Sequence, residues 1–156
     1  MRRSALLCCA ILLVGCAKTD TAADSTMAVD SAIPAATMEP APISLQQVAG
    51  KWDVRIMAET GDSTLTTYVL DAKADTAGWS FTFPNRAPIP MKVNAVAGDS
   101  IMTEAGPFDS QLQKGVKVHS LVTWRLRDAK LMGAIVSHYE TKPPSTRNLR
   151  AEGTRQ

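Results

Sequence analysis

The two histidines of the chain, His119 and His138, are the side chains best suited to bind a transition metal. They lie in two consecutive segments of alternating apolar and polar residues, which Asp128-Ala129 separates. If this dipeptide forms a two-residue hairpin loop, counting back along both strands places His119 directly opposite His138 on the outward face. Zinc sites usually need more than two protein ligands, and Glu140 is the carboxylate nearest the pair in sequence. A pair of solvated surface histidines is the alternative interpretation.

Residues for catalysis are otherwise sparse. The sequence contains no Gly-x-Ser-x-Gly, His-Glu-x-x-His or phosphate-loop pattern, so it lacks common motifs of nucleophilic, metal-dependent and phosphoryl-transfer chemistry. All three cysteines, Cys8, Cys9 and Cys16, lie near the amino terminus. We therefore expect a protein that is not an enzyme and needs no cofactor.

The amino terminus has the pattern of an export signal. Met1-Arg2-Arg3 is a charged start, and the run from Ala5 to Val14 is apolar but shorter than the roughly 20 residues of a transmembrane helix. Leu13-Val14-Gly15-Cys16 resembles the bacterial lipobox. The resemblance implies cleavage before Cys16 and lipidation of that cysteine. An ordinary signal peptide cut elsewhere is the alternative.

A lipid on Cys16 would hold the protein to a membrane of the bacterial cell envelope. Lipoprotein processing usually attaches more than one acyl chain, palmitate among them, which makes the attachment stable. Ala17 follows where an aspartate would favour retention in the inner membrane, so we expect the outer membrane. Cys8 and Cys9 would be removed with the signal, which leaves no disulfide within the folded domain.

The charge balance argues against nucleic acid as a partner. The full chain has 17 basic and 15 acidic residues, and removal of Arg2 and Arg3 leaves 15 of each. A nucleic-acid surface needs an excess of lysine and arginine. The nature of any protein partner stays open at this point.

The composition divides the chain into three parts. Residues 1–15 form the signal peptide, 16–43 a lipidated and disordered tether, and 44–156 a folded domain. The tether is rich in Ala, Thr, Ser, Asp and Pro and has no aromatic residue, so it cannot bury a core. As a flexible coil it would span about 30 Å. The eight aromatic residues all follow Gly50, so the core must lie there too.

Alternation with a period of two dominates the domain and predicts strands. It is clearest in Trp79-Ser80-Phe81-Thr82-Phe83 and over residues 116–127. Only Ser44 to Val48 could form a turn of helix. We predict eight strands near residues 50–57, 63–72, 79–83, 90–97, 100–105, 116–127, 130–140 and 147–155. Short connections favour an all-β, eight-stranded up-and-down antiparallel barrel, with a β-sandwich as the alternative.

Gly50-Lys51-Trp52 at the start of the first strand and Arg155 at the end of the last resemble the calycin pattern of lipocalins, avidins and bacterial metalloprotease inhibitors. In an up-and-down barrel the first and last strands must pair antiparallel, which predicts that Arg155 lies over the indole of Trp52. Arg150 is the alternative partner of that indole. The loops are shorter than in typical lipocalins, the inhibitors' disulfide cannot form, and no biotin site is recognisable. The resemblance therefore implies binding as a class of function.

A barrel of this size can hold one small ligand or fill its interior with side chains. We expect Trp79, Phe81 and Trp124 to line any interior pocket, and Arg86 and Glu104 to lie at the barrel mouth. The first hypothesis is an envelope lipoprotein that binds a small apolar or amphipathic ligand. The alternatives are a protein inhibitor or envelope-protection factor acting through protein contacts, and a structural envelope component. A cavity of a few hundred Å³ would support ligand binding.

Overall fold

The computed structural model describes residues 41–156, so the predicted signal peptide, Cys16 and most of the predicted tether lie outside the described residues. None of the helices in this part of the chain is long and apolar enough to cross a membrane. The elements are a short helix and nine strands: α1 Leu45–Val48, β1 Gly50–Ala58, β2 Thr64–Ala72, β3 Ser80–Thr82, β4 Ile89–Pro90, β5 Lys92–Ala97, β6 Ser100–Asp109, β7 Lys117–Arg127, β8 Lys130–Tyr139 and β9 Ser145–Arg155.

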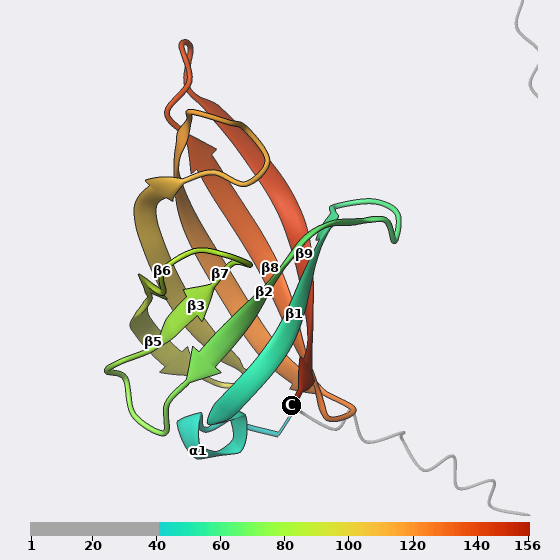
Figure 1. Ribbon diagram of the computed structural model, residues 1–156. Coiled ribbons are helices and arrows are strands. Elements are labelled where there is room, and N and C mark those ends of the chain that lie inside the picture. The colour runs from blue at the N-terminus through green and yellow to red at the C-terminus, as the bar shows by residue number, and fades with distance from the viewer. Residues whose placement is uncertain (1–40) are drawn as a thin grey trace, which may run out of the picture. The chain divides into compact units, whose positions relative to one another are not determined.

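The strands form one antiparallel up-and-down sheet that curls into a nearly closed barrel (Figure 1). Its order is β4-β3-β2-β1-β9-β8-β7-β6-β5, so the first strand pairs with the last. The two ends of the sheet, β4 and β5, are consecutive in the chain and are separated only by Met91. The predicted barrel is confirmed, and the sandwich is excluded.

The strand count differs from the prediction because the fourth strand divides at Met91. β4 pairs with β3, whereas β5 pairs with β6. Between them, the Met91 amide donates to the Trp79 carbonyl oxygen at 2.8 Å. The expected strand over 90–97 is therefore present as the end of the two-residue β4 and the six-residue β5, which pair with different strands. β6 also extends beyond residue 105 to Asp109, because its pairing with β7 resumes after an irregularity between Ala105 and Phe108.

The β7–β8 hairpin has the predicted register, with His119 opposite His138. Its two loop residues, Asp128 and Ala129, have φ angles of 48° and 61°. Two successive positive φ angles define the tight loop whose twist matches that of the flanking strands. Burial alternates strictly along β8, so the hairpin buries one face and exposes the other.

The three tryptophans are the centre of the core, and each is at most 1% exposed. Every indole N–H has an acceptor: Trp52 donates to the Val48 carbonyl oxygen at 2.8 Å, Trp79 to that of Asp75 at 2.8 Å, and Trp124 to Thr103 Oγ1 at 3.1 Å. These large rings are therefore buried without an unpaired N–H, so their apolar stabilisation is not offset by a lost hydrogen bond.

The helix α1 lies at one end of the barrel, beside the end of β9 (Figure 1). It begins with a capping box in which Ser44 and Gln47 each accept a hydrogen bond from the other's backbone N–H. Ile43 is buried, and its amide donates to the Gly98 carbonyl oxygen at 2.9 Å. The packed domain thus includes Ile43, one residue before the boundary expected from composition.

Candidate binding site on the outer face

Gly50, Trp52 and Arg155 close one end of the barrel. Trp52 and Arg155 are partners in the β1–β9 register, and the guanidinium carbon lies 4.3 Å from the centroid of the indole ring. The same guanidinium donates to the carbonyl oxygens of Gln47 at 2.6 Å and Ala49 at 2.5 Å. It therefore ties α1 to the last strand. These contacts close this end of the barrel, so a binding site must lie elsewhere on the domain.

The barrel interior is almost filled by side chains. The remaining cavity has a volume of about 40 Å³, enough for only a few water molecules. Of the three aromatic residues expected to line an interior pocket, Phe81 does so, whereas Trp79 and Trp124 pack into the core. The cavity is lined by Ile56, Tyr68, Phe81, Phe83, Met91, Ala105, Phe108, Ser120, Val122, Ile135, Ser137 and Leu149.

Four aromatic rings occupy the interior around this cavity, those of Tyr68, Phe81, Phe83 and Phe108. Their contacting centroids lie 5.2 to 6.3 Å apart in tilted or edge-to-face arrangements, which are the favourable geometries for aromatic pairs. Burial raises the pKa of the Tyr68 hydroxyl, so this group stays neutral at physiological pH. The ring cluster takes up the space that a ligand would need.

Glu104 lies on the outer face of β6, where it contacts His119 and not the barrel mouth. Its carboxylate accepts from Asn94 Nδ2 at 2.8 Å and lies 3.0 Å from His119 Nε2. The bond from Asn94 is the main cause that lowers the pKa of Glu104. The interaction was missed in sequence because Glu104 reaches His119 only through the β6–β7 register.

The two histidines are cross-strand neighbours, but each has another partner. His119 contacts Glu104, and His138 Nδ1 lies 3.0 Å from Thr146 Oγ1 on β9. Within residues 41–156 no group of three or more His, Cys, Asp or Glu side chains is arranged to hold a metal ion. The metal site stays a prediction.

Arg86 lies in the segment between β3 and β4 and attaches that segment to β6. Its Nη1 donates to the Asp109 carbonyl oxygen at 2.9 Å. With its amide oxygen turned toward the guanidinium, Gln111 accepts from Arg86 Nε at 2.7 Å. Arg86 thus positions the connection at the mouth end of the barrel.

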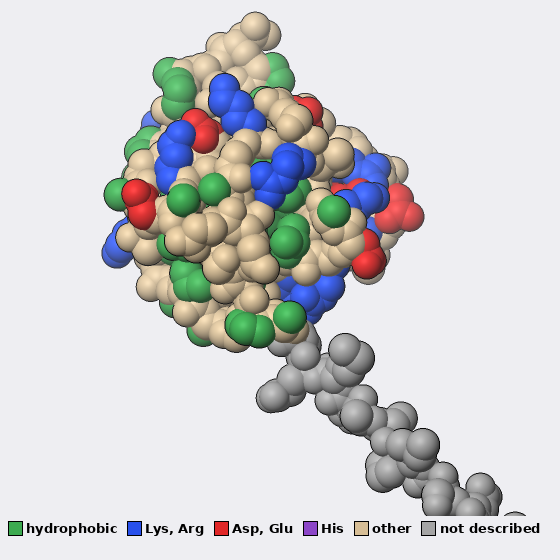
Figure 2. Space-filling model, turned by 90° about the horizontal axis from the view of Figure 1, so that it is seen from below, with side chains coloured by type: hydrophobic (Ala, Val, Ile, Leu, Met, Phe, Trp, Pro, Cys, Tyr) green, Lys and Arg blue, Asp and Glu red, His purple; other side chains and the backbone are tan. Residues whose placement is uncertain are grey.

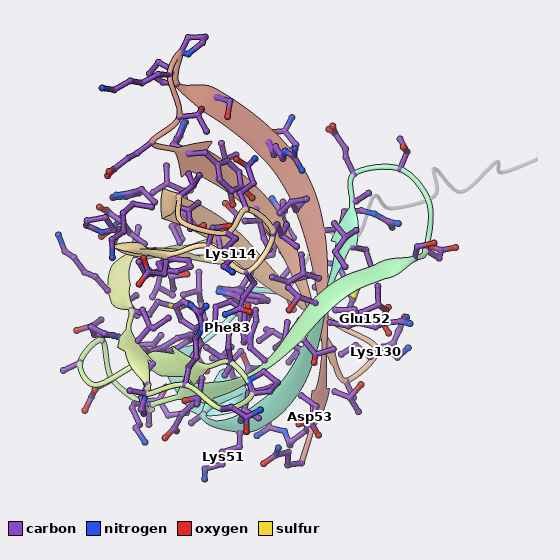
Figure 3. The ribbon with its side chains drawn as sticks, turned by 45° about the horizontal axis from the view of Figure 1, so that its top comes forward. Lys51, Asp53, Phe83, Lys114, Lys130 and Glu152 are labelled. Atoms are coloured by element: carbon purple, nitrogen blue, oxygen red, sulfur yellow. The ribbon has the colours of Figure 1, made fainter. Side chains whose placement is uncertain are left out.

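A large hollow lies on the outside, where this connection meets the sheet. This outer groove has a volume of about 620 Å³ and is open to solvent. In Figure 3, Asp53 and Glu152 lie on one side of the β1 and β2 ribbons and Phe83 on the other. The lining residues are Asp53, Val54, Arg55, Thr67, Tyr68, Val69, Thr82, Phe83, Pro84, Asn85, Arg86, Glu152 and Thr154.

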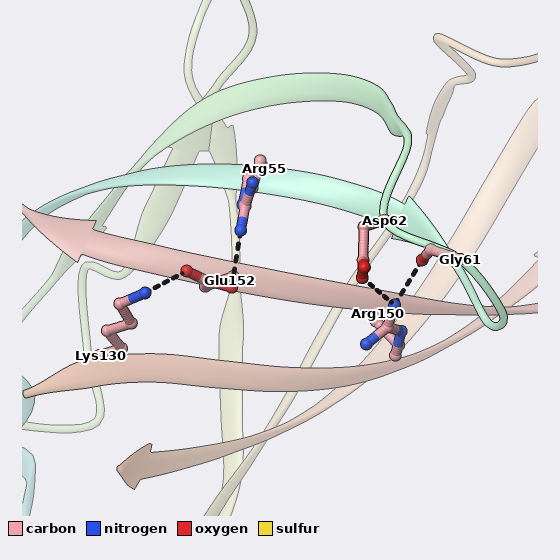
Figure 4. A network of polar contacts seen from close by, with 6 residues as sticks. All are labelled: Arg55, Gly61, Asp62, Lys130, Arg150 and Glu152. Carbon is pink, nitrogen blue, oxygen red and sulfur yellow. Dashed lines mark hydrogen bonds and ion pairs between the residues drawn. The ribbon is translucent and has the colours of Figure 1, made fainter. Parts of the chain in front are cut away.

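Glu152 is the centre of a charge network at the edge of the outer groove (Figure 4). It accepts from Lys130 Nζ at 2.8 Å and from Arg55 Nη2 at 2.9 Å, from strands on both sides of β9. These hydrogen bonds, that of Lys130 first, lower the pKa of the Glu152 carboxyl. The edge of the groove therefore carries charges of both signs, and its net charge is close to zero.

Charges of both signs are interspersed over the face of the molecule that Figure 2 displays. A surface of this kind provides no extended field of one sign. Recognition at the outer groove must then depend on shape and hydrogen bonds more than on net charge.

Sequence analysis identified only Arg86 among the residues of the outer groove. The other residues come from β1, β2, β3, β9 and the connection after β3, and they lack any shared sequence motif. Their exposed threonines looked like the ordinary polar face of half-buried strands. Comparison of the chain with protein-family models, with curated proteins and with solved structures finds no match.

Proposed function

We propose that this protein is a lipid-anchored module of the bacterial envelope, without enzymatic activity, that binds another protein at the outer groove. The observation that carries the proposal is the difference in volume between the interior cavity and the outer groove. The interior cavity measures about 40 Å³, whereas the outer groove measures about 620 Å³. Small-molecule sites are usually clefts of a few hundred Å³ or more that bury most of the ligand. The interior cavity is too small for such a ligand and the outer groove is open to solvent, which favours a partner that binds on the surface.

The lining of the outer groove combines apolar surface with polar and charged groups, which suits a segment of another protein. Thr67, Thr82 and Thr154 contribute hydroxyls, and Asp53 and Arg55 contribute opposite charges. Such groups can donate to and accept from a peptide backbone and its side chains. The lipobox at Cys16 supports attachment to the envelope, where the partner would be met.

A small apolar ligand inside the barrel was the first hypothesis from sequence. It stays a prediction, and the small interior cavity does not favour it. Binding there would require the rings of Phe81, Phe83 and Phe108 to move apart, because they are in contact with one another.

Site-specific cross-linking tests the proposal. A photo-reactive amino acid replaces Thr154, an exposed residue of the outer groove, or Leu121, which is 40% exposed on β7 outside it. After irradiation of membranes from the producing bacterium, we expect the Thr154 variant alone to form an adduct with a discrete protein. The absence of that adduct would reject protein binding at the outer groove. A small molecule retained at one per chain in native mass spectrometry would then favour an interior ligand.

A further inference from the structure

One side of β2 lacks a strand partner near the barrel mouth. β2 pairs with β1 along nearly its whole length, but β3 covers only Val69 to Asp71. Within the described part of the chain, no strand pairs with the other side of β2 from Thr64 to Tyr68. This stretch is a free strand edge, and it borders the outer groove through Thr67 and Tyr68.

The hydrogen bonds around β1 identify the backbone groups that face this free edge. The Gln156 amide donates to the Lys51 carbonyl oxygen at 3.0 Å, so the backbone of Lys51 faces β9. Successive residues of a strand face opposite sides, so Val54 faces β2, where its partner is Tyr68. Tyr68 then faces β1, and the N–H and C=O of Thr67 face the free edge.

The other side of the sheet leads to the same assignment. The Met91 amide donates to the Trp79 carbonyl oxygen at 2.8 Å, so Trp79 faces β4. By alternation Thr82 faces β2, where its partner is Val69. Thr67 lies two residues before Val69 and faces the same side. Two independent hydrogen bonds thus place the Thr67 backbone at the edge.

The nearby chain is held away from this edge. The connection after β3 turns at Pro84, and Arg86 attaches it to the Asp109 carbonyl oxygen of β6. It lines the outer groove as a wall, while Tyr68 and Phe83 line both the groove and the interior cavity. The free edge is therefore bordered by a preformed groove.

The free edge also lacks the features that usually protect strand edges. Natural edges carry proline, lysine or an inward charge that prevents pairing with another chain. β6 has Pro107 beyond its pairing with β5, whereas Thr64-Leu65-Thr66-Thr67-Tyr68 has no proline and no charge. These residues favour β structure, and Leu65 is 43% exposed.

We propose that an extended peptide segment of the partner protein pairs with β2 at Thr67 and becomes an added strand of the sheet. This inference rests on the proposed function of the outer groove and names its ligand. Backbone hydrogen bonds would provide affinity, and alternating side chains would provide specificity. The peptide residue opposite Thr67 would point outward toward Arg55, and those opposite Tyr68 would point inward toward Phe83. The segment should therefore alternate polar and apolar residues.

Two substitutions at one position separate backbone pairing from side-chain contact. Thr67→Pro removes the N–H that faces the edge and leaves the β1 pairing intact, since that pairing uses the neighbouring residues. Thr67→Val is the matched control, because it keeps the N–H and nearly the same side-chain shape. The melting temperature of each variant checks that the barrel has folded.

The probe is a set of decapeptides selected from a random phage-displayed library on the immobilised full-length protein, then synthesised with a fluorescent label. We expect alternating polar and apolar residues in the selected sequences. We also expect equal affinity for the wild type and Thr67→Val, and about tenfold or greater loss for Thr67→Pro, since at least one backbone hydrogen bond is removed. Hydrogen exchange on the wild type should show a slowed Thr67 amide when peptide is bound.

Failure to select any peptide, equal binding to Thr67→Pro, or an unchanged Thr67 amide in the wild-type complex would overturn strand addition. The exchange measurement needs no variant and decides the question if Thr67→Pro does not fold. The cross-link at Thr154 separates the two proposals. If the Thr154 adduct persists in the Thr67→Pro background, the outer groove binds protein without strand addition, whereas its absence from the parent protein rejects the proposed function itself.

Discussion

Arg155 lies over the indole ring of Trp52 across the strand pair that closes the barrel, with the guanidinium carbon 4.3 Å from the ring centroid. Trp52 is fully buried, and its N–H donates to the Val48 carbonyl oxygen. Arg155 donates to the two carbonyl groups on either side of Val48. One ring and one guanidinium thus satisfy three consecutive carbonyls at the end of α1, which leaves few polar groups unpaired at the closed end.

The two residues should contribute unequally to stability. Trp52→Ala removes a large buried ring and should lower the free energy of unfolding by about 3 to 5 kcal/mol. Arg155→Ala removes a cation–π contact of about 0.5 to 2 kcal/mol and leaves partly exposed carbonyls to water. Urea denaturation at pH 7 measures both. Arg147→Ala, at a longer 5.7 Å from the Tyr139 ring centroid, is the control and should cost least. Equal losses for Trp52→Ala and Arg155→Ala would contradict this account.

Gly50 should be difficult to replace because of Arg155. Its φ is 130°, and a Cβ atom there would lie 2.8 Å from Arg155 Nη1. We expect Gly50→Ala to lower stability by about 1 to 3 kcal/mol through backbone strain and this contact. The double variant with Arg155→Ala should cost less than the two single changes together, since the contact is absent. Gly98→Ala is the comparison, because a Cβ atom there meets nothing within 4 Å. If the stability losses of Gly50→Ala and Arg155→Ala simply add in the double variant, the contact between the two residues is unimportant.

Glu152 should make stability depend on pH in the acidic range. The lysine and arginine beside it lower the pKa of Glu152, so its carboxylate stabilises the folded state above the unfolded pKa of about 4.3. That contribution is lost as the pH falls through the lower folded-state pKa. The stability difference between the wild type and Glu152→Gln should therefore be constant from pH 7 to about 5 and shrink toward pH 3. Glu140→Gln, which removes no ion pair seen among residues 41–156, is the control. A stability difference between the wild type and Glu152→Gln that grows as the pH falls would contradict this prediction.

Attachment to the membrane should depend on Cys16. Cys16→Ser cannot be lipidated, so the protein should move to the soluble envelope fraction when cells are fractionated. Cys9→Ser is the matched control and should stay with the membranes, because this residue precedes the cleavage site. Membrane attachment of the Cys16 variant would contradict lipidation at that residue.

The histidine hypothesis predicts that zinc raises the melting temperature of the wild type and not that of His119→Ala. A ligand that binds only the native state stabilises it by mass action. The shift should be small, since zinc must displace the contacts of His119 with Glu104 and of His138 with Thr146. An equal response of the two proteins in a thermal-shift titration would leave the pair as surface histidines.

Local sequence determined most of the strands. The alternation over 116–127 and 130–140 predicted β7, β8 and their register, because a tight loop leaves one pairing that buries a single face of both strands. Gly50, Trp52 and Arg155 predicted how the barrel closes, through a resemblance that depends on residue types at the ends of the domain. Such features act between neighbours in the chain or across one strand pair, so they can be predicted from the sequence alone.

Only the tertiary structure decided what the barrel offers for binding. Whether Trp79, Phe81 and Trp124 surround a pocket depends on how closely side chains from all strands pack, and the interior cavity of about 40 Å³ is the result. The free edge at Thr67 exists because β3 ends at Thr82 and Arg86 holds the following segment against β6. Volume and strand neighbours are properties of chain segments far apart in sequence, and no local pattern of residues encodes them.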